Sequence, residues 1–511
     1  MIVILSKPLL RSQEPVPSGV EGIRGEPREL SRSWRQNNRA FGSLPCQTAP
    51  LRNFYAPASG NEFSYTGVHF SVGVGASLLP ATRSHATVAD LATHTRRQIA
   101  VRLLPFVFVL YVINYLDRTS VAYAGLHMSH DLGISDRVFG MGAGIFFVSY
   151  VALQIPGALL VELWSARRAI TIVMLAWGSL TVLTALVHNA GQLYLARFVL
   201  GAAEAGFFPG VIVYLSHWFI REDRAKATGN FMAAIPLSFV IGSPLAGWIL
   251  SHHWLALEGW RWLFVLEGMP AVLLGGFAFL FLTDWPHEAT WLEPGQRQWI
   301  AQTLEAEKAA NVGRISVWQA VRSRPVLMLA AGAFLEYFVF YTVAFWFPTI
   351  LQRVSGLPDA RLGLLGAVPY VASLVAMQVN GWHSDKRSER RAHAAVPCFV
   401  GAIALLGLVV LPQSLWPTLA LFTVLCTIHA SLPPLWALPT EILGESAAAT
   451  AVGFINSVGS VAGFAGPYAF GYLRTRTGSF SSGLALMMGC ALASGLILLR
   501  TPQAAPSHAL E

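Results

Sequence analysis

Charged side chains and cysteines are scarce in this 511-residue sequence. Asp, Glu, Lys and Arg make up 12% of the chain, about half of their share in a soluble domain, while hydrophobic residues make up 54%. An apolar surface of this extent needs a lipid environment. The 4 cysteines form no Cys-x-x-Cys pair, and most of them lie in apolar runs, so we predict neither a disulfide nor a metal site.

Motifs of nucleotide-driven and hydrolytic proteins are also missing. The sequence contains no Gly-rich phosphate loop of the Walker type, no His-Glu-x-x-His and no Gly-x-Ser-x-Gly. We therefore predict no enzyme activity and no cofactor. The net charge of +8 is placed in short loops, which fits membrane orientation and does not indicate a nucleic-acid partner.

The hydrophobic residues gather in twelve runs of about 20 residues, each long enough to cross the hydrocarbon core of a bilayer. We predict an all-α integral membrane protein with twelve transmembrane helices. The runs lie near residues 103–125, 138–162, 169–187, 192–215, 229–251, 261–282, 325–348, 360–382, 394–412, 415–436, 449–472 and 480–500. Most Lys and Arg residues of the short loops fall on one side, which predicts a multi-pass protein of the cell inner (plasma) membrane with both termini in the cytoplasm.

A polar stretch, residues 284–323, separates the sixth run from the seventh. Its Trp299, Ile300 and Leu304 have the spacing of a short amphipathic helix at the membrane surface. We interpret the stretch as a cytoplasmic linker between two domains.

The two halves of the chain also repeat. ELWSARR at 162–168 corresponds to DKRSERR at 385–391, as expected when the second half copies the first. Two parallel six-helix bundles with the substrate path between them are therefore predicted. The bundles are expected to cover residues 96–283 and 324–501, followed by a short C-terminal tail at 502–511.

Residues 1–95 do not share this pattern. They are rich in Pro, Ser, Gly and Arg and contain no sustained apolar stretch typical of a signal peptide. Two interpretations are open: a disordered N-terminal tail, or a start codon assigned too far upstream. The next methionine, Met128, lies beyond the first run, so a later start would use a codon other than that of Met.

Four charged side chains lie inside the apolar runs: Asp117 and Arg118 in the first, and Arg197 and Glu204 in the fourth. An ionised group near the bilayer midplane costs roughly 2.5–3.5 kcal/mol on the mildest scale, so such groups usually pair, face a cavity, or move ions and substrates. Arg197 and Glu204 are seven residues apart, which brings both to one helix face about 10 Å apart along the axis. We predict that these four residues form the functional site.

Several longer motifs resemble the anion:cation symporter branch of the major facilitator superfamily. They are NYLDRTSVAYA at 114–124, RFVLGAAEAGFFPG at 197–210, GWRWLFVLEGMPAV at 259–272, FWFPTIL at 345–351, WALPTEIL at 436–443 and GFINSVGSVAGFAGPY at 453–468. This branch includes bacterial carriers for phthalate, tartrate, glucarate and galactonate, and the animal carrier sialin. The resemblance implies the superfamily fold and the transport of an organic anion.

The charged pattern is similar to that of the galactonate-type carriers in this branch. They have an Asp-Arg pair in the first span, and an Arg followed seven residues later by a Glu in the fourth. The resemblance implies that Asp117 and Glu204 take up the coupling protons, while Arg118 and Arg197 bind the anion. The chemistry agrees, because a guanidinium binds a carboxylate as a planar fork and does not release protons.

Other residues are candidates for contact with the substrate. The resemblance places Tyr150 and Asn456 at substrate-contacting positions, and hydrogen bonding between helices is the alternative for both. Tyr337, Tyr341 and Trp346 are candidates for stacking on the carbon skeleton of a sugar acid or an aromatic acid.

Three further polar residues lie in the apolar runs. Glu336 is a candidate for lining the cavity from the C-terminal half, whereas Glu267 is expected to pair with a nearby arginine such as Arg261. His429 is either a proton relay or a packed histidine.

The loop after the second span matches only part of the superfamily signature Gly-x-x-x-Asp-x-x-Gly-x-basic-basic. Glu162 stands for the Asp and Ser165 for the second Gly. The resemblance implies that this loop and its second copy gate the cytoplasmic side through charge pairs, and the alternative is that the charges only set the orientation. The predicted gating residues are Glu162, Arg167, Arg168, Asp385, Arg390 and Arg391.

These observations predict a secondary transporter that imports an organic carboxylate by proton symport with alternating access. We expect deprotonated Glu204 to hold Arg197, and protonation of Glu204 to release Arg197 to the substrate. The alternative is a permanent structural ion pair, Arg197–Glu204 or Arg118–Asp117. An anion exchanger or an efflux antiporter on the same fold is the alternative function, and sodium is the alternative coupling ion. The expected partners are the small organic anion, protons and the lipid bilayer, and a monomer is expected.

Overall fold

The computed structural model describes residues 81–255, 257–310, 321–443 and 445–502, and residues 83–502 of these belong to one compact unit. Apart from short 3-10 turns, the described chain forms α-helices and loops, with no strand among the described residues. In the searched part of the chain, 11 segments are long and apolar enough to cross a membrane. The twelfth predicted span, 449–472, lies in a further long helix, Glu445–Thr477. The prediction of an all-α membrane protein is confirmed.

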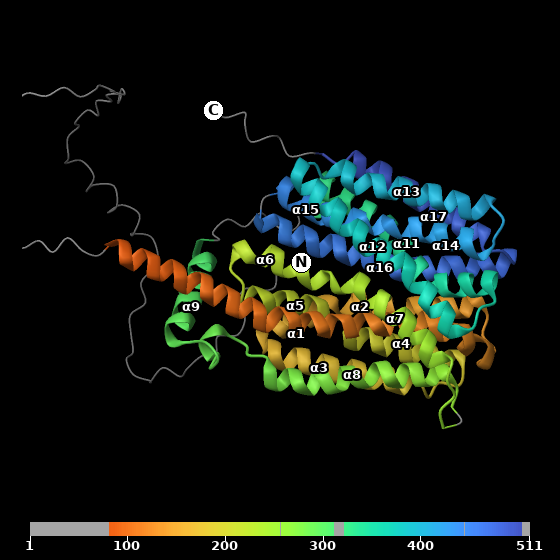
Figure 1. Ribbon diagram of the computed structural model, residues 1–511, viewed down its shortest axis with the longest axis horizontal. Helices are drawn as coiled ribbons and strands as arrows, with labels where there is room; N and C mark the ends of the chain where they lie inside the picture. Colours follow the sequence, from red (N-terminus) through yellow and green to blue (C-terminus); the bar gives the residue numbers. More distant parts are fainter. Residues whose placement is uncertain (1–80, 256, 311–320, 444, 503–511) are drawn as a thin grey trace, which may run out of the picture. The chain divides into compact units, whose positions relative to one another are not determined.

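The helices form two groups, coloured orange to green and cyan to blue in Figure 1. The N-terminal bundle consists of α1 (Ala81–Asp131), α2 (Asp136–Leu163), α3 (Ala166–Thr184), α4 (Ala190–Glu204), α5 (Phe207–Ser216), α6 (Arg221–Met232), α7 (Ala234–Leu250) and α8 (Gly259–Phe281). The C-terminal bundle consists of α11 (Arg324–Ser355), α12 (Asp359–Arg387), α13 (Arg391–Val410), α14 (Leu415–Cys426), η3 (Thr427–Ser431), α15 (Leu432–Leu443), α16 (Glu445–Thr477) and α17 (Ser481–Leu499).

Polar side chains set several helix starts, and a glycine sets one helix end. Ser135 begins α2 by accepting a hydrogen bond from the Val138 amide, and Asn189 begins α4 in the same way. The helix α11 ends at Gly356, whose φ of 58° is in the left-handed region that a glycine adopts without strain. These signals turn the chain at the membrane surfaces and so fix the length of each span.

Some spans contain a break in the helix. The fourth span divides into α4 and α5 directly after Glu204, and the tenth span is interrupted by η3 between α14 and α15. A break frees backbone groups from the regular hydrogen-bond ladder, and such breaks in membranes are tolerated where they are buried in protein or line a cavity. Both breaks lie beside polar side chains that are described below.

The two bundles contact each other through α2 against α16 and α7 against α12. Glycines allow the closest approach. A Cβ atom at Gly140 of α2 would lie 2.5 Å from the Pro467 carbonyl oxygen of α16, and one at Gly363 of α12 would overlap the Ser243 carbonyl oxygen of α7. We call this the closed end of the interface, because backbone meets backbone there.

Polar contacts between the bundles occur at the closed end too. His127 Nε2 of α1 lies 3.0 Å from Asp359 Oδ2 of α12, and Arg474 Nε of α16 lies 3.4 Å from Asp136 Oδ2 of α2. Toward the opposite end, a Cβ atom at Gly453 of α16 would meet nothing within 4 Å. Among the described residues, the close glycine contacts between the bundles therefore gather at the closed end.

The linker between the bundles packs on the N-terminal bundle. It contains the 3-10 turn η2 (Pro286–Glu288) and the helix α9 (Pro294–Ala310), where Ile300 and Leu304 are buried. Asp284 accepts hydrogen bonds from the Ser165 hydroxyl at 2.7 Å and from the Arg167 amide at 2.8 Å. An amphipathic helix was predicted here, and its buried face lies against protein.

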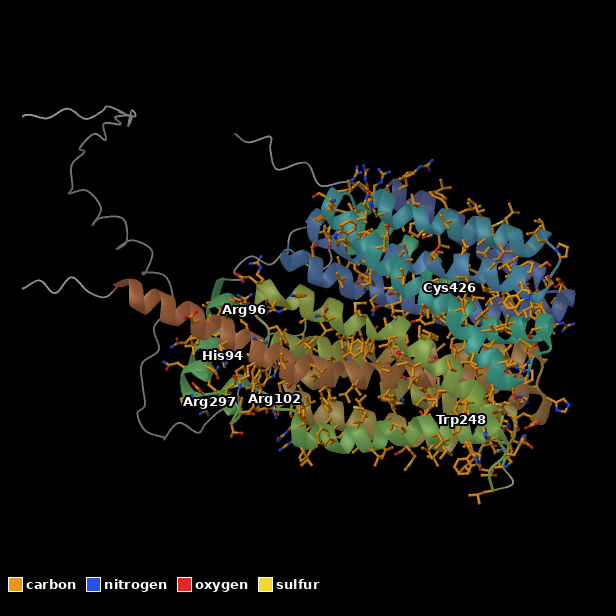
Figure 2. All side chains as sticks on the ribbon, in the orientation of Figure 1. His94, Arg96, Arg102, Trp248, Arg297 and Cys426 are labelled. Atoms are coloured by element: carbon orange, nitrogen blue, oxygen red, sulfur yellow. The ribbon has the colours of Figure 1, made fainter. Side chains whose placement is uncertain are left out.

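The first helix begins much earlier than the sequence pattern indicates. The tail was predicted to reach residue 95 and the span to begin near 103, yet α1 begins at Ala81. The reason is packing: Arg96 binds Asp223 at 2.7 Å, and Gln98 donates to the Trp291 carbonyl at 2.9 Å. Figure 2 shows His94, Arg96 and Arg102 of α1 on the side where α9 carries Arg297. The predictions for residues 1–80 and for 503–511 lie outside the described residues.

Candidate functional site

The four predicted charged residues lie together in the interior of the N-terminal bundle, and all are at most 5% exposed. They form two crossed pairs between α1 and α4. Arg118 Nη2 lies 2.6 Å from Glu204 Oε1, and Arg197 Nη1 lies 3.7 Å from Asp117 Oδ2. The first pair is a short charge-assisted hydrogen bond, whereas the second is beyond hydrogen-bond distance.

This pairing differs from the expectation that Glu204 holds Arg197, and also from the alternative of an Arg118–Asp117 pair. The reason is helix geometry. Arg197 and Glu204 are two turns, about 10 Å, apart along the axis of α4, and each reaches one of two adjacent residues of α1, so neither pairs with the other. Asp117 is also held from a third helix, because Thr181 of α3 donates its hydroxyl to Asp117 Oδ1 at 3.0 Å.

A cavity lies between the bundles next to Arg118. Five of the seven residues named as candidates for contact with the substrate line its wall: Arg118, Tyr150, Tyr337, Tyr341 and Asn456. Both bundles contribute to this set, so the wall belongs to both halves of the protein. Its free volume is about 40 Å³, which holds a few water molecules, and an organic acid would fit only after wall side chains move apart.

Aromatic rings surround the Arg118 guanidinium on the cavity wall. Its Cζ atom lies 4.5 Å from the ring centre of Tyr115 and 5.4 Å from that of Tyr150. Such rings attract a cation through their negative faces and hold the guanidinium plane in place. The arrangement leaves a positive group at the wall of an otherwise largely aromatic cavity.

Several residues of the cavity wall were not predicted from the sequence, above all Tyr111, Tyr115 and Ser460. For the two tyrosines a signal was present. Tyr111, Tyr115 and Arg118 follow a spacing of four and three residues, which places them along one face of α1. Nothing in the sequence marks Ser460 in the same way.

Two predicted substrate contacts do not lie on this cavity. Arg197 is 0% exposed, lies behind the Phe146 ring at 4.9 Å, and is not part of the wall. Its guanidinium nitrogens make no hydrogen bond within the described structure. Trp346 instead donates to the Pro467 carbonyl at 3.2 Å and packs edge-on against Phe139 of the other bundle. Its aromatic ring therefore packs at the closed end of the bundle interface and is not available for stacking on a substrate in the cavity.

The expected pairing of Glu267 with Arg261 is wrong. Arg261 donates to the carbonyl oxygens of Ala185 and Val187 and stacks on Trp260, while both carboxylate oxygens of Glu267 are buried without a hydrogen-bond partner in the described residues. Residues six apart on a helix are separated by about 120° around the axis and about 9 Å along it, so the two side chains point to different faces.

His429 and Glu336 lie in the interior of the C-terminal bundle. His429 Nδ1 is 2.8 Å from the Ser373 hydroxyl, and its ring packs edge-on against Phe340, which lines the cavity. Glu336 is fully buried and does not line the cavity. The expectation that Glu336 faces the cavity is therefore not met in this conformation.

The two copies of the predicted gating loop differ. In the second copy, Arg390 bridges Asp385 at 2.5 Å and Glu441 at 2.8 Å, so a charge cluster joins α12, α13 and α15. In the first copy, Arg167 and Arg168 lie against the aromatic rings of Phe279 and Trp164.

No ion pair of Glu162 is present among the described residues, and Arg391 donates weakly to the Thr501 carbonyl at 3.5 Å. Ser165 fits its turn well, because its hydroxyl caps α3 by accepting from the Arg168 amide at 3.1 Å. The replacement of the signature glycine by Ser165 is thus explained by capping.

No group of three or more His, Cys, Asp or Glu side chains that could hold a metal ion occurs in the searched part of the chain. Two helical bundles with buried charges beside a cavity at their interface define a secondary transporter. The chain belongs to the Major Facilitator Superfamily, whose profile matches residues 107–467.

Similar proteins agree with this assignment. A relative from Agrobacterium vitis named a tartrate transporter is 40% identical over 82% of this chain and 97% of its own length. A quinolone resistance transporter from Acinetobacter baumannii is 34% identical over 80% of this chain and 95% of its own. A solved bacterial homolog of the lysosomal transporter Spinster shares the fold with a TM-score of 0.63, at 19% identity, covering 79% of this chain and 95% of its own. The first relative fits the anion:cation symporter branch that the motifs resemble.

Proposed function

We propose that this transporter imports an organic carboxylate together with protons. The observation that carries the proposal is the contact between Arg118 and Glu204. Arg118 borders the cavity, while its partner Glu204 lies behind it, 1% exposed. The positive group needed for an anion is thus held by a carboxylate that substrate must replace.

Replacement of Glu204 by a substrate carboxylate requires a proton. A buried carboxylate that loses its only cationic partner costs several kcal/mol, and protonation removes this cost. The second oxygen of Glu204 has no hydrogen-bond partner within the described structure, so nothing else stabilises the separated anion. Substrate at Arg118 and a proton at Glu204 therefore support each other, which is the thermodynamic definition of coupling.

The pair of Asp117 and Arg197 is a second place for the same exchange. At 3.7 Å it is already loose, and Asp117 has a second partner in Thr181. A substrate with two carboxylates would use both arginines and bring two protons. In each case the charge of the site stays constant, because every bound carboxylate neutralises one carboxyl of the protein by protonation.

Alternating access follows from the unequal ends of the bundle interface. The arginine-rich side of the loops predicts that the closed end, with His127 and Asp359, faces outward. The described conformation is then closed to the outside, and the looser end faces the cytoplasm. Opening requires separation of the His127–Asp359 and Arg474–Asp136 pairs.

The substrate class that the cavity favours is a small carboxylic acid with hydroxyl groups or a ring. Tyrosine hydroxyls, Asn456 and Ser460 offer hydrogen bonds, and the aromatic faces offer stacking. The relative named a tartrate transporter supports a hydroxylated dicarboxylate. A thermal-shift screen with tartrate, glucarate, galactonate and phthalate would identify the acid, because a ligand that binds only the folded state raises the melting temperature.

Proteoliposomes test the coupling. With the acid selected by the screen, an inward proton gradient should drive uphill uptake and acidify the lumen. Uptake that a protonophore leaves unchanged would contradict proton symport.

An efflux antiporter or an exchanger is the second candidate, and the relative named a quinolone resistance transporter favours it. In that case an inward proton gradient would drive the substrate out of the vesicle instead of into it. The direction of substrate movement under the same gradient separates the two candidates.

A further inference from the structure

Glu336 lies on α11, on the opposite side of the cavity wall from the Arg118 site. It is 0% exposed, and neither carboxylate oxygen has a hydrogen-bond partner among the described residues. The next residue, Tyr337, lines the cavity, and so does Phe340 one turn along the helix. The carboxyl is therefore one layer behind the surface that a substrate would touch.

The surroundings of this carboxyl are polar but contain no cation. Cys398 of α13 lies within electrostatic reach of Glu336, and its thiol donates to the Ser494 hydroxyl at 3.7 Å. Ser431 lies beside the Cys398 thiol, in the 3-10 break η3 of the tenth span. Polar groups of α13, α17 and η3 thus lie together at the Cys398 thiol, which is within electrostatic reach of the buried acid.

Ionisable groups near Glu336 do not neutralise it. Tyr337 on its own helix and Cys398 on α13 are both neutral partners, and no ion pair joins Glu336 to any described Lys, Arg or His. His429 of η3 is held by Ser373 instead. An isolated carboxylate in such surroundings would cost far more than the bundle can supply, so the group takes up a proton and becomes neutral.

We propose that Glu336 is a second proton-binding site of the transport cycle, located in the C-terminal bundle. The proposal rests on the proposed proton-coupled import. In the conformation described here the carboxyl is neutral and sealed from water. When the bundles move apart, the layer formed by Tyr337 and Phe340 opens to the cavity, and Glu336 exchanges its proton with cavity water. Glu336 releases this proton to water on the cytoplasmic side, and the empty carrier returns with the carboxylate in contact with cavity water, so each cycle carries one proton that is not matched by a substrate carboxylate.

This extra proton changes the charge balance of transport. Exchange at the Arg118 site is electroneutral, because each substrate carboxylate brings one proton. The loaded carrier crosses with Glu336 neutral, and the empty carrier returns with Glu336 negatively charged, so one positive charge moves inward per cycle. Uptake thus becomes sensitive to membrane potential, by a factor of about 50 in the accumulation ratio for about 100 mV acting on one elementary charge.

The protonation of Glu336 is measurable without a substrate. Infrared spectroscopy of the full-length protein in lipid shows a carboxylic-acid C=O stretch only for a protonated acid. We expect a band at neutral pH that Glu336→Gln removes and that disappears reversibly as wild-type protein is titrated to alkaline pH. Because no anion is added, this result does not depend on whether the proposed import is right.

Glu336→Asp is the matched control, since it keeps a titratable carboxyl at the same place. It should keep a band, shifted in frequency, and this shift also assigns the band if Glu336→Gln does not fold. Spectra of wild type and both variants that agree in the carboxylic-acid region would show that Glu336 is ionised and overturn the proposal. A Glu336 band that does not change with pH would overturn it as well, because the acid would then be a permanent structural group. Failure of proton-driven uptake with an intact titrating band would instead count against the import proposal.

Discussion

Arg118 Nη2 and Glu204 Oε1 lie 2.6 Å apart in the interior of the N-terminal bundle, and only the arginine borders the cavity. The carboxylate thus holds the guanidinium from behind the cavity wall. In the proposed import, an anion that enters the cavity competes with Glu204 for this guanidinium. Protonation of Glu204 would then decide the competition in favour of the substrate.

Replacement of Glu204 by Gln should keep binding and remove one coupled proton. Gln is neutral at every pH, so affinity for the acid should depend less on pH than in wild type. With a gradient of about one pH unit, the accumulation ratio in proteoliposomes should fall about tenfold, the equivalent of one proton. Counterflow exchange should persist, since the loaded carrier still reorients. A variant that accumulates as much as wild type would move the coupling role to Asp117.

Replacement of the two arginines by Lys should give different results. Arg118→Lys keeps the charge on the cavity wall but loses the planar fork, so affinity for the acid should fall roughly 10-fold to 100-fold. Arg197→Lys does not touch the cavity wall, so with a monocarboxylic acid it should affect the pH dependence of uptake more than affinity. Isothermal titration and uptake at several pH values measure both. Equal losses of affinity in the two variants would contradict the division between them.

Because the backbones pack closely at Gly363, a substitution there should shift the equilibrium from the described conformation toward one that is open to the outside. Gly363→Ala places a methyl group against the Ser243 carbonyl of the other bundle, which should disfavour the described conformation by about 1–3 kcal/mol. Gly276→Ala on α8 is the control, because a Cβ atom there meets nothing within 4 Å. Opening toward the outside exposes the cavity, so in right-side-out vesicles Asn456→Cys should react faster with an impermeant maleimide in the Gly363→Ala background only. Faster labelling in both backgrounds would show that the methyl group at residue 363 is not the cause.

The voltage dependence of uptake tests the unmatched proton at Glu336. A potential of about 100 mV, negative inside, should raise accumulation of the acid selected by thermal shift about 50-fold more in wild type than in Glu336→Gln, while both respond to a pH gradient. Glu336→Asp, which keeps a titratable carboxyl at the same place, should keep the wild-type response to voltage. Potassium diffusion potentials with valinomycin provide the measurement. A voltage response that Glu336→Gln leaves intact would show that the charge moves elsewhere.

The spans and the two-bundle fold could be predicted because a bilayer imposes long apolar runs on any helix that crosses it. The location of the site followed from the same rule, since Asp117, Arg118, Arg197 and Glu204 are charges where lipid allows none. Their crossed pairing could not be predicted. It depends on the level at which α1 and α4 pass each other, and sequence spacing within one helix does not contain that information.

Other errors had a physical cause that the sequence did contain. Arg261 and Glu267 are six residues apart and lie about 120° from each other around the helix, so helix geometry already argued against their pairing. The early start of α1 could not be predicted from the sequence. Residues 90–102 have too many polar groups for a span, and they are helical because Arg96 and Gln98 find partners in α6 and in the linker.

Proton uptake on binding of the acid tests the central claim most directly. Purified protein in weakly buffered solution near neutral pH is mixed with the acid selected by thermal shift, neutralised beforehand, and a pH indicator records the protons taken up. Wild type should take up protons as it binds, and Glu204→Gln should take up one fewer per bound molecule. Wild-type protein that binds the acid without taking up a proton would contradict the exchange between Glu204 and the substrate carboxylate at Arg118.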